Sequence, residues 1–292
     1  MQSDKNLSAF TLRIAEISIG FLLAGSEPQP SLQTERTALP FETGDHFVFR
    51  VHLGSMPELG IDRPVFNCSN WALYRSHNRL VLQDSGLDPG ELPQERVLMD
   101  LVKREGDIFI RDEGSHGDLR SITLGYPLNQ LLMILFLSES KGLLHHGCGI
   151  EDRGLGYLFV GNSGQGKSTM AKVWSAEGAR VLNDDRVVVR GKKEEFWMYG
   201  TPWHGDFKEF STKGLPISKI FFLYPDRENR LIPHEGAKAV SMLLTRSFPP
   251  LWDKEGMIFT AGFCHRLVSA VPCYEFHFKQ DQSVIDFVRN EA

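Results

Sequence analysis

The stretch "LFVGNSGQGKSTMAKVW", residues 158–174, decides the fold. Its apolar start predicts a buried strand, a glycine-rich loop follows, and the lysine, serine and threonine open a helical pattern. Residues 161–168 match the pattern G-x-x-x-x-G-K-[ST] in full. In this pattern the glycines let the backbone curl, so that its N–H groups point at phosphate oxygens beside a helix N-terminus. The stretch therefore predicts a nucleotide-binding P-loop.

The loop residues divide into a backbone cradle for phosphate and a few side chains with separate roles. Lys167 would reach the β- and γ-phosphates, and Ser168 would offer its hydroxyl to Mg²⁺, with Thr169 as a supporting donor. We therefore expect ATP and Mg²⁺ as cofactors. The predicted nucleotide-binding residues are Gly161, Asn162, Ser163, Gly164, Gln165, Gly166, Lys167, Ser168 and Thr169.

Composition and charge exclude several classes of protein. The longest apolar run, residues 131–137, is far shorter than the roughly 20 residues of a membrane-spanning helix. The N-terminus has no basic flank leading into an apolar segment, so we expect a cytoplasmic protein without a secretory signal. The 4 cysteines are scattered without a Cys-x-x-Cys pair, which argues against structural zinc and disulfides. A net charge of −5 disfavours nucleic acid as a partner.

The chain divides by pattern into two predicted domains. Residues 1–117 are mostly strand-like and predict a small β-rich module for substrate recognition. Within it, residues 11–23 alternate with a phase slip near Ala15, and residues 71–84 predict a hairpin that turns at His77 and Asn78. Residues 25–40 are turn-rich and predict an exposed loop.

Residues 118–292 alternate strand and helix and predict a catalytic P-loop domain of α/β class, a mixed sheet flanked by helices. A helix is expected to begin near Pro127 and to end before Gly142. The expected strands are residues 157–160, 179–184, 186–190, 194–200 and 219–225, and the further expected helices are 167–177, 237–248 and 281–290.

Two adjacent carboxylates follow the P-loop. Asp184 and Asp185 lie sixteen and seventeen residues after Ser168, between two predicted strands. Phosphoryl transfer needs positioning, charge neutralisation and a base, so one carboxylate can hold Mg²⁺ while the other accepts a proton. The structural alternative is an ordinary acidic turn, which Asn-Asp-Asp also favours. No apolar run into Asp-Glu and no Ser-Gly-Gly signature is found, which argues against a motor or transporter ATPase.

Together these motifs carry a resemblance. His146-Gly147, the loop "GNSGQGKST" fifteen residues after His146, and "VLNDD" resemble the catalytic domain of bacterial HPr kinase/phosphorylases, in the phosphoenolpyruvate-carboxykinase-like group. The match covers residues 145–189. The resemblance implies a kinase acting on a serine hydroxyl and allows for a homo-oligomer. It implies that Asp184 is the general base assisted by His146, that Asp185 supports the metal with Ser168, and that Lys167 belongs to the catalytic set.

The chain departs from these enzymes after the acidic pair. Their Glu-Ile-Arg-Gly-x-Gly segment is not found, so the substrate protein HPr is not carried over. The stretch "GTPWHGDF", residues 200–207, instead resembles a segment of shorter HPr-kinase-like proteins, some of which phosphorylate a peptide serine. Trp203 offers a stacking face and His204 a hydrogen-bonding group, so both are expected to line a substrate pocket. The alternative is a turn held by a packed tryptophan.

The sequence thus predicts an ATP-dependent kinase that transfers the γ-phosphoryl group to a serine-type hydroxyl of a peptide, protein or small molecule. Two alternatives remain open. One is a nucleotide-responsive module that binds a peptide or protein without phosphotransfer. The other is a plain NTPase whose base activates water.

Overall fold

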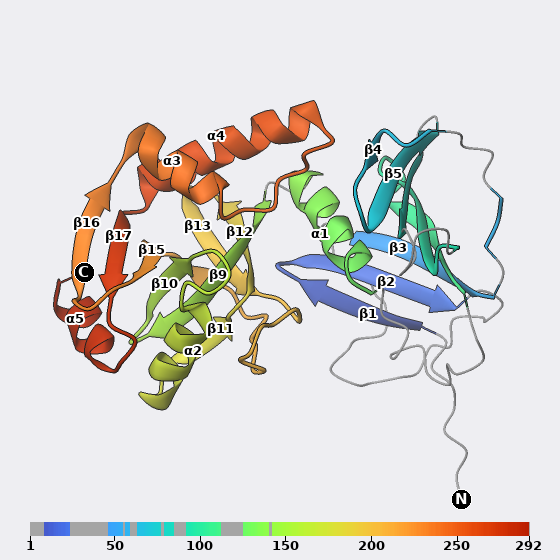
Figure 1. Cartoon of the computed structure of the whole chain (residues 1–292). Coiled ribbons are helices and arrows are strands. Elements are labelled where there is room, and N and C mark those ends of the chain that lie inside the picture. The colour runs from blue at the N-terminus through green and yellow to red at the C-terminus, as the bar shows by residue number, and fades with distance from the viewer. Residues whose placement is uncertain are drawn as a thin grey trace, which may run out of the picture. The chain divides into compact units, whose positions relative to one another are not determined.

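The computed structural model describes residues 9–23, 46–54, 56–58, 63–76, 79–84, 92–111, 125–139 and 142–291. The chain divides into two compact units, Met1–Met133 and Ile134–Ala292, which Figure 1 shows as two groups of elements. The described residues form five helices and two mixed β-sheets, so the predicted α/β class is confirmed at that level. The predicted domain boundary near Gly117, the loop 25–40, and the turn residues His77 and Asn78 lie outside the described residues.

Unit 1 contains an eight-stranded sheet in the order β1-β2-β3-β8-β7-β6-β5-β4. Strands β2 and β8 flank β3 and run parallel to it, and the other neighbours are antiparallel. The strands are β1 Ala9–Ile14, β2 Ile17–Leu23, β3 His46–Leu53, β4 Phe66–Asn67, β5 Trp71–Ser76, β6 Arg79–Asp84, β7 Glu95–Asp100 and β8 Glu105–Ile110.

Local patterns explain several of these strands. The phase slip near Ala15 is a tight turn, because Ala15 and Glu16 both have positive φ angles, 49° and 65°, and reverse the chain between β1 and β2. The alternation in β3 buries Phe47, Phe49 and Val51 on one face. The predicted hairpin 71–84 is confirmed as the antiparallel pair β5 and β6.

Unit 2 contains a nine-stranded sheet whose centre is the long strand β9, Gly142–Asp152. Strand β9 pairs with β10, β11 and β12, while β10, β15 and β17 run parallel to one another. The order is β14-β13-β12-β9-β10-β15-β17-β16. The other strands are β10 Leu155–Val160, β11 Arg180–Asn183, β12 Arg186–Lys192, β13 Glu195–Gly200, β14 Leu215–Pro216, β15 Lys219–Pro225, β16 Arg230–His234 and β17 Cys273–Phe278.

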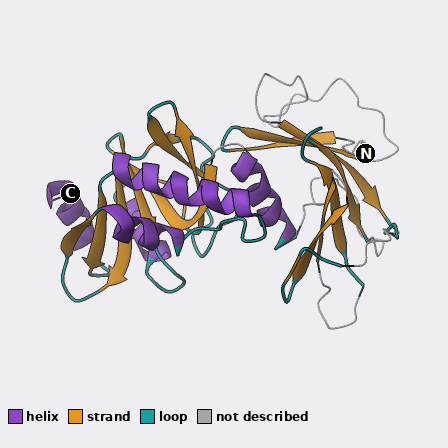
Figure 2. Ribbon diagram, turned by 90° about the horizontal axis from the view of Figure 1, so that it is seen from above, coloured by secondary structure: helices purple, strands orange, loops and turns teal. Residues whose placement is uncertain are grey.

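Helices cover both faces of the unit 2 sheet. On one face lie α3, Gly236–Leu244, and α4, Lys254–Ala270, which Figure 2 shows lying across the strands. On the other face lie α2, Lys167–Ala176, and α5, Ser283–Glu291, which bury apolar side chains against the sheet. The unit therefore has three layers and two hydrophobic clusters, one on each face of its sheet.

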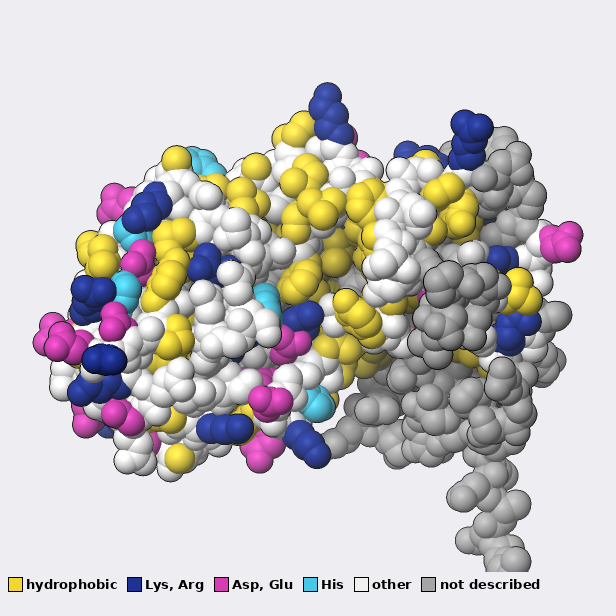
Figure 3. All heavy atoms as spheres, viewed as in Figure 1, with side chains coloured by type: hydrophobic (Ala, Val, Ile, Leu, Met, Phe, Trp, Pro, Cys, Tyr) yellow, Lys and Arg dark blue, Asp and Glu magenta, His cyan; other side chains and the backbone are white. Residues whose placement is uncertain are grey.

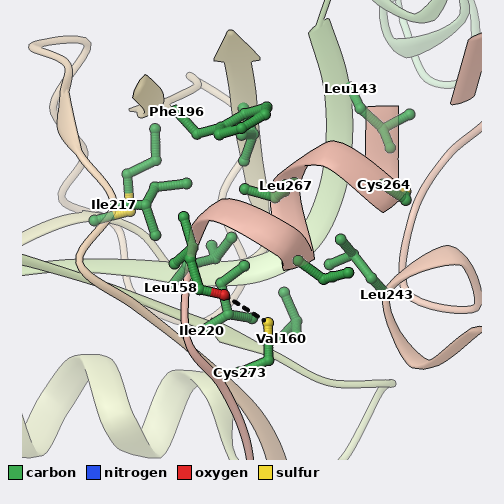
Figure 4. Close-up of a cluster of buried hydrophobic side chains, with 14 of the residues drawn as sticks. Leu143, Leu158, Val160, Phe196, Ile217, Ile220, Leu243, Cys264, Leu267 and Cys273 are labelled. Atoms are coloured by element: carbon green, nitrogen blue, oxygen red, sulfur yellow. Dashed lines mark hydrogen bonds between the residues drawn. The ribbon is translucent and has the colours of Figure 1, made fainter. Parts of the chain in front are cut away.

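The cluster under α3 and α4 is built by alternate residues of the central strands. Figure 4 shows Leu158, Val160 and Ile220 of the sheet facing the two helices. Leu243 of α3, and Cys264 and Leu267 of α4, supply the opposing side chains. Because neighbouring residues of a strand point to opposite faces, Phe159 and Phe221 belong to the other cluster, beneath α2 and α5.

Several elements of unit 2 differ from the sequence-based expectations. Helix α3 ends at Leu244, not at Phe248, and the segment that follows runs beside β9. Helix α4 and strand β17 have no predicted counterpart. The buried stripe of α4 includes glycine, threonine and cysteine beside its apolar residues, so the sequence lacks a strong apolar period there.

Helix α1, Leu128–Glu139, is buried from Leu131 to Leu137, as expected for a helix that is apolar on all sides. Among the described helices, none combines the length and the apolar character that crossing a membrane requires. On the face shown in Figure 3, acidic and basic side chains are intermixed over unit 2, so neither sign of charge dominates that face.

The packing of α4 gives a first prediction. Phe263 is fully buried, with ring centroids 5.4 Å from Phe196 and 5.7 Å from Phe259. We expect Phe263→Ala to lower the free energy of unfolding by about 3–5 kcal/mol, because it removes buried surface and leaves a cavity. The control on the same helix is Ile258→Ala, since Ile258 is 57% exposed and its loss should change stability by less than about 0.5 kcal/mol. Equal losses in urea unfolding would contradict the described packing of α4.

Candidate functional site

The predicted phosphate loop lies between the end of β10 and the start of α2. Gly166 is the residue before the helix and has a left-handed backbone, with φ 86°; Gly164 also has a positive φ of 78°. A Cβ atom on Gly166 would lie 2.6 Å from Cζ of Phe278, whereas one on Gly164 would meet nothing within 4 Å. Glycine at 166 is therefore required by backbone conformation and by space, and at 164 by conformation alone.

The loop presents unused donors at the helix start. Within the described part of the chain, the backbone N–H groups of Gly164, Gly166, Lys167 and Ser168 have no acceptor. Amides at a helix N-terminus carry partial positive charge and form a binding site for anions. This arrangement, together with the open space around Gly164, fits the phosphate cradle that the sequence predicts.

Lys167 bends back over the loop. It is 6% exposed, and its Nζ donates to the carbonyl oxygen of Asn162 at 2.9 Å. Burial lowers the pKa of Lys167 below its usual value, with the Asp185 carboxylate opposing that shift. The ammonium group therefore lies at the loop with a carbonyl oxygen as its hydrogen-bond acceptor, a contact that a phosphate group can replace.

Asp184 connects the loop to the acidic turn. The Ser168 hydroxyl donates to its Oδ2 at 2.7 Å, the amide of Phe207 donates to the same oxygen at 3.0 Å, and the amide of Gly205 donates to Oδ1 at 2.7 Å. Asp184 is only 1% exposed. Both oxygens therefore accept hydrogen bonds from the protein itself, and one of the donors is the hydroxyl predicted to bind Mg²⁺.

Buried Asn183 holds the acidic turn in place. Its Oδ1 accepts from the amides of Asp185 and Arg186 at 2.6 and 2.7 Å. Its Nδ2 donates to the carbonyl oxygens of Thr201 and Trp203 at 2.8 and 3.0 Å. This one amide side chain thus joins the end of β11 to the loop that follows β13.

The stretch 200–207 contacts Asp184 and Asn183 through its backbone. The contacts to Asp184 and Asn183 come from amide and carbonyl groups, including the carbonyl of Trp203. The Trp203 side chain is half-buried, and His204 is exposed, with Nδ1 3.0 Å from the carbonyl oxygen of Gly205. The substrate-pocket role of these two side chains stays a prediction.

Asp185 points to a different set of partners. Its Oδ1 lies 2.9 Å from Nε2 of His146 and 2.7 Å from Nη1 of Arg186. Among the described residues, Oδ2 accepts no hydrogen bond, and the side chain is 25% exposed. Burial alone would raise the pKa of Asp185, but the His146 hydrogen bond and the charges of Arg186 and Lys167 bring it below its usual value.

The side chains of the two adjacent histidines of β9 point to opposite faces of the sheet. His146 faces Asp185, whereas His145 is fully buried on the opposite face, with Nδ1 3.0 Å from the Ser247 hydroxyl. Burial lowers the pKa of His145 to about 3, so it stays neutral. The structure therefore brings His146, Lys167, Ser168, Asp184 and Asp185 together and leaves His145 in the core.

Sequence reasoning missed four contributors to this site. Asn183 and Arg186 flank the acidic pair directly, and the amides of Gly205 and Phe207 bind Asp184. The Asn-Asp-Asp run was a usable signal for Asn183, because asparagine commonly accepts from backbone amides two residues on. The sequence gives no comparable signal for a backbone donor, because every residue type except proline has an amide N–H.

Magnesium fits these residues in one specific way. Among the described residues, no group of three or more His, Cys, Asp or Glu side chains could hold a metal ion. Mg²⁺ does not need one, since it usually binds through one or two carboxylates together with substrate phosphates and water. The Ser168 hydroxyl, beside the loop amides, would be the protein ligand, and Asp184, which accepts from that hydroxyl at 2.7 Å, would orient it.

Comparison with known proteins adds no relative: no protein-family model matches the chain, and a search of curated proteins finds no match. The resemblance to HPr kinases stays a prediction that rests on the motifs themselves.

The unequal bonding of the two carboxylates predicts unequal effects on stability. We expect Asp184→Asn to lower the free energy of unfolding by about 1–3 kcal/mol, because the new NH₂ group faces donors that the carboxylate accepted. Asp185→Asn should cost less, since its remaining oxygen still accepts from His146 and Arg186. Urea unfolding of the nucleotide-free protein measures both. A larger loss for Asp185→Asn would contradict these bonding patterns.

The lowered pKa of Asp185 determines how its contribution to the stability of the folded protein changes with pH. A carboxylate whose pKa is lower in the folded state stabilises the protein above its unfolded-state pKa, and that contribution disappears as the pH falls through the folded-state pKa. Between about pH 6 and pH 3, wild type should therefore lose more stability than Asp185→Asn, which has no proton to gain. Parallel loss of the urea midpoint in both proteins would be evidence against the ion pair.

Proposed function

We propose that this protein is an ATP-dependent kinase that transfers the γ-phosphoryl group to a hydroxyl acceptor on a peptide, protein or small molecule. The observation that carries the proposal is the pairing of two differently bonded carboxylates beside one P-loop. Asp184 contacts the Ser168 hydroxyl, and Asp185 has an oxygen free of hydrogen bonds within the described structure. Phosphoryl transfer requires these two functions, metal support and a base, next to the phosphates.

The bonding favours a division of roles opposite to the one implied by the family resemblance. Asp184 accepts three hydrogen bonds from the protein and is nearly inaccessible, so it suits orientation of the Ser168 hydroxyl, which would bind the metal. Asp185 is partly exposed and has the available oxygen, so it suits proton acceptance. In the proposed kinase, Asp185 is the general base, and Asp184 orients Ser168, the residue that would bind the metal.

The remaining residues bind and orient. The loop amides and Lys167 would hold the phosphates, and His146 fixes Asp185 through Oδ1. Magnesium, when bound with the nucleotide, would supply charge neutralisation at the phosphate oxygens.

The proposed transfer moves one proton and one phosphoryl group. Oδ2 of Asp185 takes the proton of the acceptor hydroxyl, and the acceptor oxygen forms a bond to the γ-phosphorus. The bond from that phosphorus to the β–γ bridging oxygen breaks, and the electron pair leaves with ADP.

Loss of the base or of the lysine should abolish most transfer. We expect Asp185→Asn and Lys167→Ala each to lower the rate of phosphotransfer by about 10²- to 10⁴-fold, the usual effect of removing a general base or a phosphate-binding cation. The matched control is Lys172→Ala, since Lys172 is an exposed lysine on the same helix. Phosphorus NMR of the reaction with ATP and serine-containing peptides measures the product.

The products also distinguish the alternatives. A phosphorylated hydroxyl supports the kinase, and free phosphate alone would favour a plain NTPase. Nucleotide binding by calorimetry without any turnover would favour a binding module, and unchanged transfer in both variants would remove the proposal altogether.

A further inference from the structure

His146 and Arg186 act on the same oxygen of Asp185. Nε2 of His146 lies 2.9 Å from Oδ1, and Nη1 of Arg186 lies 2.7 Å from that oxygen. The two donors come from neighbouring antiparallel strands, where Arg186 at the start of β12 is opposite His146 in β9. Two donors on one oxygen restrict rotation of the carboxylate and leave the other oxygen as its free basic atom.

The Arg186 side chain stacks on the ring of Phe248. Its guanidinium carbon lies 4.3 Å from the centroid of the Phe248 ring, and the side chain is only 14% exposed. Phe248 is held against β9, because its amide donates to the carbonyl oxygen of Leu144 at 2.9 Å and the preceding residue bridges to His145. A stacked and largely buried arginine has few alternative positions, so its contact with Asp185 is well defined.

The backbone of Arg186 has a separate role that a substitution would not remove. Its amide donates to Oδ1 of Asn183 at 2.7 Å, and its carbonyl accepts from the Thr201 hydroxyl at 2.9 Å. The turn therefore keeps its main-chain hydrogen bonds when the side chain is changed. The guanidinium contributes the contact to Asp185 and a charge close enough to Lys167 to lower the pKa of that lysine.

We propose that Arg186, supported by Phe248, is a positioning residue that together with His146 holds Oδ1 of Asp185 and so presents Oδ2 to the acceptor hydroxyl. This inference rests on the proposed function. It assigns the orientation of the base to a pair of donors and identifies the residue after the acidic pair as part of the site. Arg186 acts through Asp185 and takes no proton in the transfer.

The first test needs no substrate. Carbon-13 NMR of labelled aspartate carboxyls, assigned with Asp185→Asn, follows the protonation of Asp185 in the nucleotide-free protein. We expect Arg186→Gln to move this titration to higher pH, because it removes a cation that favours the ionised carboxylate. Arg186→Lys keeps a cation at this position, so its titration should move to higher pH by less than that of Arg186→Gln. Phe248→Leu should also move the titration to higher pH by a smaller amount. The matched control is Lys192→Gln on the same strand, whose lysine stacks on Trp197.

The second test measures transfer with water as the acceptor, by release of inorganic phosphate from magnesium ATP. We expect Arg186→Gln to lower kcat by about 10- to 100-fold through misplacement of the base, to leave the KM for ATP within about 2-fold, and to move the acid limb of the kcat/KM profile to higher pH. Arg186→Lys should recover part of kcat, and Lys192→Gln should match wild type.

The two tests separate the two proposals. A wild-type protein that releases no phosphate and modifies no acceptor contradicts the proposed function, whatever the carboxyl titration shows. An Asp185 titration and an acid limb that move no more in Arg186→Gln than in Lys192→Gln overturn the positioning role, even in an active kinase.

Discussion

The buried carboxylate of Asp184 is the constraint on which the candidate site depends. Its two oxygens accept from the Ser168 hydroxyl and from the amides of Gly205 and Phe207, so one side chain joins helix α2 to the loop after β13. A buried carboxylate without such donors would cost several kcal/mol, so the three donors stabilise the folded unit. The same requirement fixes the neighbouring turn, where Asn183 repeats the pattern with a neutral amide.

Adjacent residues do different work here because strands and turns direct neighbouring side chains apart. His145 enters the core while His146 reaches Asp185, and Asp184 turns to Ser168 while Asp185 turns to Arg186. Each pair has the same chemistry in the sequence and different surroundings in the structure. Division of labour between two identical carboxylates by environment alone is a recurring way to separate acid–base work from charge support.

Local patterns predicted much of this architecture, and non-local contacts account for the rest. The glycine loop with its strand and helix, helix α1, and the hairpin of β5 and β6 follow from residues close in sequence. Helix α4 was missed because glycine, threonine and cysteine lie on its buried face. The distribution of roles within Asn-Asp-Asp could not be read from spacing, because it depends on backbone amides of Gly205 and Phe207, which any residue type other than proline supplies.

The contact between Gly166 and Phe278 has a consequence for how the protein is made. The ring that fills the space beside the third loop glycine belongs to β17, near the end of the chain, while the loop lies near the start of unit 2. A ribosome releases the chain from its N-terminus, so the loop glycines emerge long before the side chain that packs against them. In a nascent chain this loop should therefore reach its packed conformation late, only after β17 has joined the sheet.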